Sequence, residues 1–287
     1  MGVVVWADGK LRGEREAVAT AVDHGLTVGD GVFETCGVVG GQAFALTRHL
    51  RRLKRSATGL GLDAPDEDEV RAGVAAVLAA GGSGLGRVRI TVTAGPGPLG
   101  SNRAARGTDR LTILVLAGPG PRPETVRVAR VPWVRNERSA VAGLKTTSYA
   151  ENVVALASAV ERGADEALIA NTVGELCEGT GSNVFVERGS ELVTPTLASG
   201  CLAGITRELM LEWGVEAGLP VREAGLGELP FTVLDEVSAG RSGLALSSSV
   251  RNVVPVVNLD GVELTAGPLS LAAQRLFEVK ASEEIDP

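Results

Sequence analysis

The chain has 287 residues, of which 44% are apolar and 22% are charged, a composition typical of a soluble globular protein with one large or two modest domains. The net charge of -7 and the lack of a basic stripe argue against a nucleic-acid partner. No run of residues is apolar enough to span a membrane, and the N-terminus lacks the pattern of a signal peptide. We therefore expect a cytoplasmic protein with no membrane partner.

The cysteines and histidines are too few and too scattered to suggest a metal site. Cys36, Cys177 and Cys201 cannot all pair with one another and show no C-x-x-C spacing. His24 and His49 are the only histidines of the chain. The sequence therefore predicts neither a disulfide framework nor a metal centre.

Residues 1–117 predict a smaller N-terminal α/β domain. Apolar residues at helical spacing and acids in a first turn predict two helices, and apolar runs bounded by glycine predict strands. We expect helices at residues 47–62 and 66–82, a hairpin opening at 2–11, two strands around the Gly40-Gly41 turn, and strands at 86–95 and 110–118.

The stretch "GPGPRPETV" (residues 118–126) contains three prolines and two glycines, which favours an interdomain linker; a long loop is the alternative. Residues 127–287 then form a larger C-terminal α/β domain. We expect helices at 148–164, 204–218 and 267–281, a hairpin at 183–195, and strands at 166–171, 236–240, 243–248 and 252–258. The predicted class is α/β (α+β) with two domains.

Lys145, in "GLKTTSYAENV", is unusual because the chain has only four lysines against 24 arginines. It lies in a largely apolar segment that contains glycine, and an amine in apolar surroundings is less readily protonated and more nucleophilic. Lys145 is therefore a candidate for Schiff-base chemistry. A partly exposed loop lysine would have the same sequence context.

Three further stretches suggest a phosphorylated cofactor. Glu178, in "GELCEGTGSNVFV", can pair with a protonated ring nitrogen, although an acid that caps a turn is the simpler interpretation. "LAGITRELMLEW" opens a helix at Ile205 and Thr206, whose free amides would bind a phosphate; Thr206 can instead be the helix cap. The hydroxyls of "ALSSSVRNVVPV" end a strand and can bind phosphate oxygens or form a polar loop.

Together with "VWADGKL", "GDGVFET" and "RHLRRLKRSA", these stretches resemble the class IV aminotransferase family, the fold-type IV enzymes that use pyridoxal 5′-phosphate (PLP). The family includes branched-chain and D-amino acid aminotransferases and 4-amino-4-deoxychorismate lyase. The resemblance spans most of the chain. It implies a two-domain fold with PLP between the domains, in which the C-terminal domain carries the PLP lysine, and a homodimer.

The resemblance implies two chemical roles. Lys145 matches the lysine that holds PLP as a Schiff base and moves the proton at the substrate α-carbon. Arginine cannot replace it because a guanidinium stays protonated. Glu178 matches the acid that keeps the pyridine nitrogen protonated. Tyr149 lies one residue closer to the lysine than the tyrosine of branched-chain enzymes, so its role stays open.

The resemblance also implies a set of phosphate-binding residues. Arg52, in the basic helix, matches an arginine that reaches the cofactor phosphate. Ile205 and Thr206 match the helix N-terminus whose amides hold that phosphate. Ser249 matches a hydroxyl on the phosphate, six residues before Pro255.

The implied activity is transfer of an amino group between an amino acid or amine and a 2-oxo acid. The alternative is the lyase, which converts aminodeoxychorismate to 4-aminobenzoate and pyruvate; a PLP-binding protein without turnover is a remote third. Glu34 replaces a threonine that is thought to donate a proton in a well-known form of the lyase, which favours the transaminase. Arg89, Arg103 and Arg251 are candidates for binding a substrate carboxylate.

Overall fold

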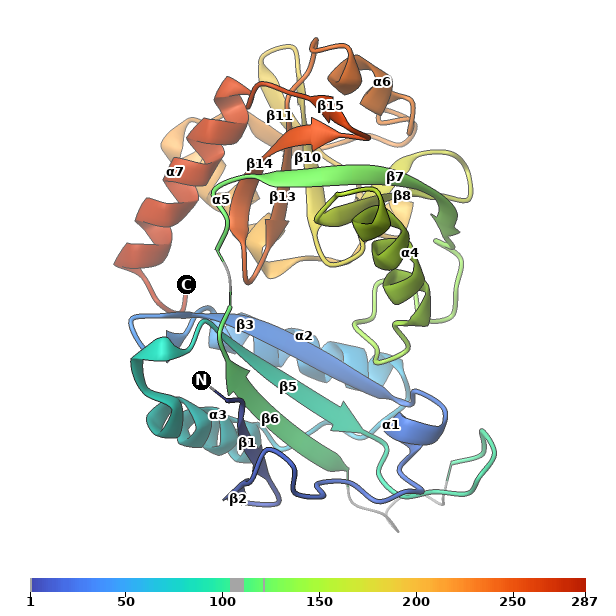
Figure 1. The fold of residues 1–287 in the computed structure, drawn as a ribbon, viewed down its shortest axis with the longest axis vertical. Coiled ribbons are helices and arrows are strands. Elements are labelled where there is room, and N and C mark those ends of the chain that lie inside the picture. The colour runs from blue at the N-terminus through green and yellow to red at the C-terminus, as the bar shows by residue number, and fades with distance from the viewer. Residues whose placement is uncertain (1, 104–110, 121) are drawn as a thin grey trace. The chain divides into compact units, whose positions relative to one another are not determined.

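The computed structural model describes residues 2–103, 111–120 and 122–287 (Figure 1). Contacts within the chain divide it into two compact units. The first unit comprises Met1–Pro121, Leu144–Tyr149 and Glu284–Pro287, and the second comprises Arg122–Gly143 and Ala150–Glu283. The division after residue 121 falls within the predicted linker, of which Pro121 itself lies outside the described residues.

The first unit contains a six-stranded antiparallel sheet in the order β2-β1-β6-β5-β3-β4. The predicted N-terminal hairpin is confirmed, with Asp8 and Gly9 both at positive φ in its turn. The strands are β1 (Val4–Ala7), β2 (Lys10–Arg12), β3 (Gly31–Val39), β4 (Gln42–Ala43), β5 (Arg87–Thr93) and β6 (Thr112–Gly118).

Two helices cover one face of this sheet (Figure 1). The predicted helix with acids in its first turn is confirmed, because Asp66 caps it by accepting from the amides of Asp68 and Glu69. Leu53 and Val70, one from each long helix, lie in the core of the unit. The helices are α1 (His24–Thr27), α2 (Leu46–Gly59), α3 (Glu67–Gly81) and the short 3-10 helix η1 (Gly82–Gly84).

Helix α2 takes its N-terminal cap from the far end of the chain. Ala45, which precedes the helix, has φ 52° and offers no side-chain cap. Instead the Asp286 carboxylate accepts hydrogen bonds from the Thr47 amide at 2.8 Å and the Thr47 hydroxyl at 2.6 Å, and the Ala45 amide donates to the Ile285 carbonyl at 2.8 Å. Residues 284–287 therefore complete the first unit.

The second unit contains a nine-stranded mixed sheet in the order β12-β11-β10-β13-β14-β7-β8-β9, with β15 paired to β14. Strand β7 runs parallel to both β8 and β14, and β11 runs parallel to β12, which confirms a mixed α and β class. The strands are β7 (Val126–Arg135), β8 (Glu166–Asn171), β9 (Leu176–Gly179), β10 (Asn183–Arg188), β11 (Glu191–Thr194), β12 (Val221–Glu223), β13 (Leu244–Ser248), β14 (Asn252–Leu259) and β15 (Val262–Glu263).

The helices of the second unit pack on this sheet and on each other. Trp213 of α5 and Phe277 of α7 lie with ring centroids 5.1 Å apart. The predicted strand at 236–240 was wrong, because Val233 and Val237 are buried at helical spacing in α6. The helices are α4 (Ala150–Glu161), α5 (Ile205–Ala217), α6 (Val233–Ser238), α7 (Pro268–Glu283) and the 3-10 helix η2 (Leu197–Ser199).

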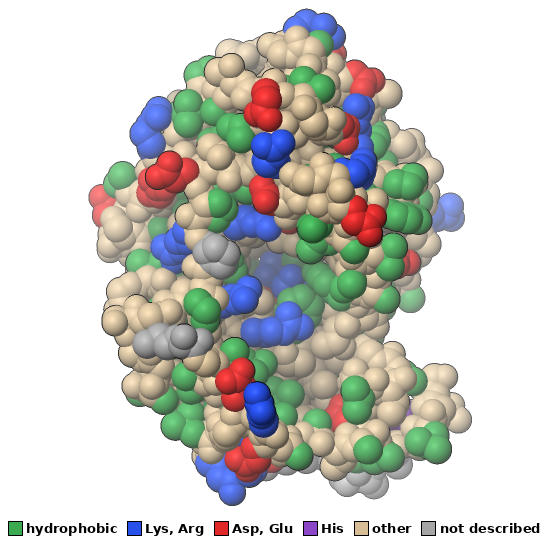
Figure 2. Space-filling model, in the orientation of Figure 1, with side chains coloured by type: hydrophobic (Ala, Val, Ile, Leu, Met, Phe, Trp, Pro, Cys, Tyr) green, Lys and Arg blue, Asp and Glu red, His purple; other side chains and the backbone are tan. Residues whose placement is uncertain are grey.

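The surface shows charges of both signs. On the face drawn in Figure 2, acidic and basic side chains are interspersed over the second unit. Among the described residues, no helix combines the length and the apolar character that crossing a membrane requires.

Candidate active site

The main chain of Lys145 is held between β3 and α2 of the first unit. The Lys145 amide donates to the Ser56 hydroxyl of α2 at 3.2 Å, and the Lys145 carbonyl accepts from the Phe33 amide of β3 at 3.0 Å. Thr146 forms a bridge with Val32. These contacts place Lys145 in the first unit and not in the C-terminal domain expected from the sequence. The reason is that the segment around Lys145 pairs with β3, a strand more than a hundred residues earlier in the chain.

The Lys145 amine lies among aromatic rings. Its Nζ is 4.4 Å from the centroid of Phe33 and 3.4 Å from the hydroxyl of Tyr149, and the rings of Phe33 and Tyr149 meet edge to face at 5.0 Å. Tyr149, whose role the sequence left open, therefore contacts the amine directly. The guanidinium of Arg89 lies over the same Phe33 ring at 3.8 Å.

Arg89 and Arg103, the two candidates for a substrate carboxylate in the first unit, differ in their partners. Arg103 makes two hydrogen bonds of 2.6 Å to the carboxylate of Asp30. Arg89 is exposed, and no carboxylate among the described residues forms an ion pair with it. Surrounding protein nevertheless removes enough water to lower the pKa of Arg89.

Arg52, predicted to reach the cofactor phosphate, is buried in α2 against β3. Its Nε and Nη2 each donate to a different oxygen of Glu34 at 2.7 Å, and His49 Nδ1 lies 2.7 Å from Glu34 Oε2. Burial would raise the pKa of Glu34, but the charge and hydrogen bonds of Arg52 hold it far below its usual range. Burial also lowers the pKa of His49 from 6.5, so this histidine is neutral at pH 7.

Glu178 lies on β9 in the second unit with its side chain largely buried. Its Oε2 accepts from the Leu202 amide at 2.9 Å, and its Oε1 lies 3.2 Å from Arg135 Nε. Arg135 also donates to Asn152 at 3.2 Å. Arg135 was not predicted from the sequence because no motif marks the end of β7, although a buried carboxylate calls for a nearby cation or hydrogen-bond donors.

The N-terminus of α5 has the properties of an anion site. Gly204, at the cap position, provides no side-chain acceptor. Within the described part of the chain, no acceptor bonds the amides of Ile205 and Thr206, both of which are buried. A Cβ on Gly204 would collide with the side chain of Asn183, so a larger residue there would force a shift. Unsatisfied amides next to a glycine suit a phosphate group.

Ser249 lies half-buried in the turn between β13 and β14. Two residues before it, Ser247 is 1% exposed and its hydroxyl has no partner among the described residues. Arg251, considered for a second substrate carboxylate, instead pairs with the buried Glu166 at 2.9 Å.

The cysteines and the cavity of the second unit lie outside these sets. Burial raises the pKa of Cys201 to about 11 and raises that of Cys177 further, so neither is a reactive thiol. No cluster of metal ligands occurs among residues that the structure describes.

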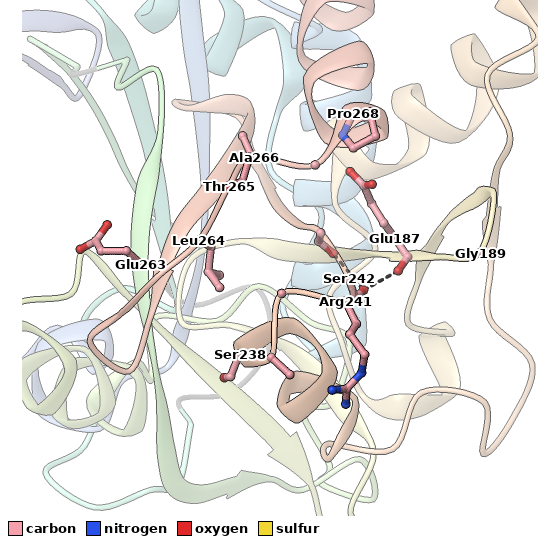
Figure 3. Close-up of a pocket in the computed structure, with 14 residues that line it drawn as sticks. Glu187, Gly189, Ser238, Arg241, Ser242, Glu263, Leu264, Thr265, Ala266 and Pro268 are labelled. Carbon is pink, nitrogen blue, oxygen red and sulfur yellow. Dashed lines mark hydrogen bonds between the residues drawn. The ribbon is translucent and has the colours of Figure 1, made fainter.

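A cavity of about 600 Å³ is lined by none of the predicted site residues (Figure 3). It lies between the β10–β11 turn, the loop after α6 and the start of α7.

The predicted residues thus form one set in each unit. In the first unit, α2 carries Arg52 and binds the main chain of Lys145 through Ser56. In the second unit, the Leu202 amide ties Glu178 to the segment that leads into α5. Arg135, Ser56 and the pairing of Glu34 with Arg52 were not predicted from the sequence.

Known proteins resemble this chain over most of its length. The family model described as "Amino-transferase class IV" matches residues 31–259. A Methanocaldococcus jannaschii protein, provisionally named a branched-chain-amino-acid aminotransferase, is 33% identical over 90% of this chain and 88% of its own length. The fold is similar to that of a branched-chain aminotransferase of Thermoproteus uzoniensis (TM-score 0.84, 30% identity, 99% of this chain and 96% of that chain).

A 4-amino-4-deoxychorismate lyase of Pseudomonas aeruginosa also has a similar fold, with TM-score 0.80 and 27% identity over 99% of this chain and 100% of that one. The family model covers most of the sequence, including Lys145, Glu178 and the start of α5. The chain belongs to the class IV aminotransferase family.

Proposed function

We propose that this aminotransferase uses PLP to move an amino group between an amino acid or amine and a 2-oxo acid. The observation that carries the proposal is the setting of Lys145, an amine fixed through its own main chain and placed against Phe33 and Tyr149. The donor sets described above fit the cofactor, since they supply an amine, a buried carboxylate and unsatisfied helix amides.

Lys145 would bind the cofactor as an imine and hold or move the proton at the substrate α-carbon. When bound, protonated PLP withdraws electrons from that carbon. Tyr149 can donate to, or accept from, the lysine amine at the observed 3.4 Å and so help to orient it. Glu178, oriented by the Leu202 amide and the charge of Arg135, would bind the protonated ring nitrogen.

The phosphate would be held by main-chain amides and by polar side chains. Ile205 and Thr206 would donate their main-chain amides, and Ser249 its hydroxyl. Arg52 would add charge-assisted hydrogen bonds from its guanidinium. These roles follow from the family resemblance and are supported by the unsatisfied amides of α5.

Arg89 is the better candidate for a substrate carboxylate, because Asp30 already engages Arg103 and Glu166 already engages Arg251. An arginine that has lost part of its hydration and has no described carboxylate partner is ready to bind one. We expect Arg89→Met to raise KM for glutamate, which has two carboxylates, by about tenfold or more, the order of magnitude for a lost charged hydrogen bond. The change in KM for norvaline, which has one carboxylate, should be smaller.

The lyase is the second candidate, favoured by the similar fold of the Pseudomonas aeruginosa lyase. Glu34 cannot serve it as a proton donor, because its carboxylate is fully buried and paired with Arg52. This supports the transaminase.

The deciding experiment mixes the PLP-loaded protein with D- and L-amino acids, amines and aminodeoxychorismate while the visible spectrum is recorded. Conversion of the cofactor to its pyridoxamine form by an amino donor supports transamination. Release of pyruvate from aminodeoxychorismate alone would establish the lyase. No reaction with any compound would leave a PLP-binding protein without turnover.

We also propose a homodimer in the cytoplasm. The apolar residues exposed on α4 and at the end of β7 offer a surface for a second copy; they are Trp133, Val134, Val153, Val154 and Val160. Light scattering should give twice the 29.4 kDa of one chain, and a mass of one chain would refute the dimer.

A further inference from the structure

A buried cluster of Glu34, His49 and Arg52 joins β3 to α2 in the first unit. Glu34 is 0% exposed, and both of its oxygens accept from Arg52 at 2.7 Å. His49 lies on the same face of α2, three residues before Arg52, and its Nδ1 approaches the same carboxylate at 2.7 Å. Since this histidine is neutral, it donates its Nδ1 proton to Glu34, which fixes its tautomer.

Stability alone does not account for this cluster. The charges of Glu34 and Arg52 cancel, and a buried ion pair of this kind is often no more stabilising than apolar residues of the same volume. What the pair does supply is orientation, because a two-point contact leaves the planar guanidinium a single direction.

The cluster also lies next to the main-chain contacts of the lysine. Phe33, whose amide binds the Lys145 carbonyl, precedes Glu34 on β3. Ser56, whose hydroxyl binds the Lys145 amide, is one turn after Arg52 on α2. The pair therefore connects the two elements that hold Lys145.

We propose that Glu34 is a positioning residue that both aims Arg52 and supplies its counter-charge when no cofactor is bound. The inference rests on the proposed phosphate contact of Arg52. The arginine then meets a phosphate as a fixed set of N–H donors whose charge is already balanced. Because Glu34 and the phosphate share one guanidinium, each weakens the hold of the other. PLP therefore binds more weakly than it would if Arg52 had no carboxylate partner.

The test compares PLP with pyridoxal, which lacks the phosphate, in binding to the cofactor-free protein. Glu34→Gln removes the carboxylate charge and leaves the buried guanidinium of Arg52 without a counter-charge. The phosphate of PLP would relieve part of that large cost, so we expect PLP to bind more tightly, on the order of tenfold. Pyridoxal affinity should stay unchanged. The control is Glu67→Gln, which removes an exposed glutamate that pairs with Arg71 on α3 and should alter neither affinity.

A purely structural pair predicts a different result. Equal changes in the two affinities, or weaker PLP binding, would overturn the inference. If Glu34→Gln does not fold, Glu34→Asp keeps the charge but shortens the reach; the ratio of PLP to pyridoxal affinity should then rise by a smaller factor, and an unchanged ratio would count against the inference. Arg52→Met tests the proposed function separately, because an unchanged ratio there would remove Arg52 from the phosphate whatever Glu34 does.

Discussion

The two units offer opposite chemistry at the residues predicted to bind one cofactor. The first supplies cationic side chains, and its arginine at position 52 is already paired with a carboxylate. The second supplies a carboxylate and the uncharged amides of Ile205 and Thr206, for which no described acceptor is found. The difference teaches that a full charge does not by itself make the better anion site. Unsatisfied neutral donors bind a phosphate without sharing it with a carboxylate that weakens the contact.

The largest expected effect is on the amine of the first unit. Lys145→Ala should abolish the visible absorption band of PLP bound to the protein and lower amino transfer by more than about a thousandfold, since the variant loses both the covalent link and the proton carrier. Lys54→Ala, which removes an exposed lysine of α2, is the matched control and should retain both. An unchanged band in Lys145→Ala would show that the chemistry uses another amine.

The acid of the second unit should rank next. Glu178→Gln keeps the volume of the side chain but removes the charge that would hold the ring nitrogen protonated, so we expect kcat to fall on the order of a hundredfold while PLP stays bound. Glu161→Gln, at an exposed position at the end of α4, should be neutral. Full activity in Glu178→Gln would remove this residue from the site.

The amide site allows a direct test of the comparison. Gly204→Val places a side chain where even a Cβ meets Asn183, so either Asn183 or the start of α5 must shift. We expect α5 to move and PLP affinity to fall by about tenfold or more, because the phosphate donors lose their alignment. Pyridoxal affinity should fall less. In Gly100→Ala the added Cβ meets open space, and no change is expected. Equal losses for both ligands would argue against a phosphate at α5.

The smallest effect should be a pH dependence of the Glu34–His49–Arg52 cluster in the first unit, which the amides of Ile205 and Thr206 cannot show because amides do not titrate. The folded pKa of His49 is lowered from 6.5, so the unfolded chain takes up this proton first as pH falls below 6.5, and stability is lost by up to about 1.4 kcal/mol per pH unit. Glu34, with its pKa lowered from 4.5, adds a further loss below that pH.

Urea unfolding at pH 7, 6 and 5 measures this slope. His49→Gln keeps a donor for Glu34 but does not titrate, so the slope between pH 6.5 and 5 should become shallower. An equally steep slope in that variant would assign the acid sensitivity to other groups.

Local patterns allowed much of the fold to be predicted. The hairpin opening at 2–11, the acids in the first turn of α3 and the helix at 204–218 depend on neighbouring residues only, and each is found as expected. Strand β7 was not predicted because it starts within the proline-rich stretch read as a linker. Helix α6 was predicted as a strand because six residues are too few to distinguish the helical repeat of apolar residues from that of a strand.

The site residues were found through motifs, and their partners were not. The pairing of Arg52 with Glu34 joins a helix to a strand 18 residues away, and Arg135 meets Glu178 across the sheet. Such contacts are set by strand order and register, which a single sequence does not reveal. The roles of Arg52, Ile205, Thr206 and Ser249 are predictions.

The first unit is discontinuous in sequence, and this bears on how the protein folds. Residues 1–121 alone would lack the segment that pairs with β3 through Thr146 and the Asp286 carboxylate that caps α2. During synthesis on the ribosome, α2 must wait for Ile285 and Asp286 before its first turn is capped. The nucleation of this unit therefore depends on contacts between distant residues, which slows folding relative to a unit built from local contacts. A fragment ending at residue 121 is a poor candidate for independent expression.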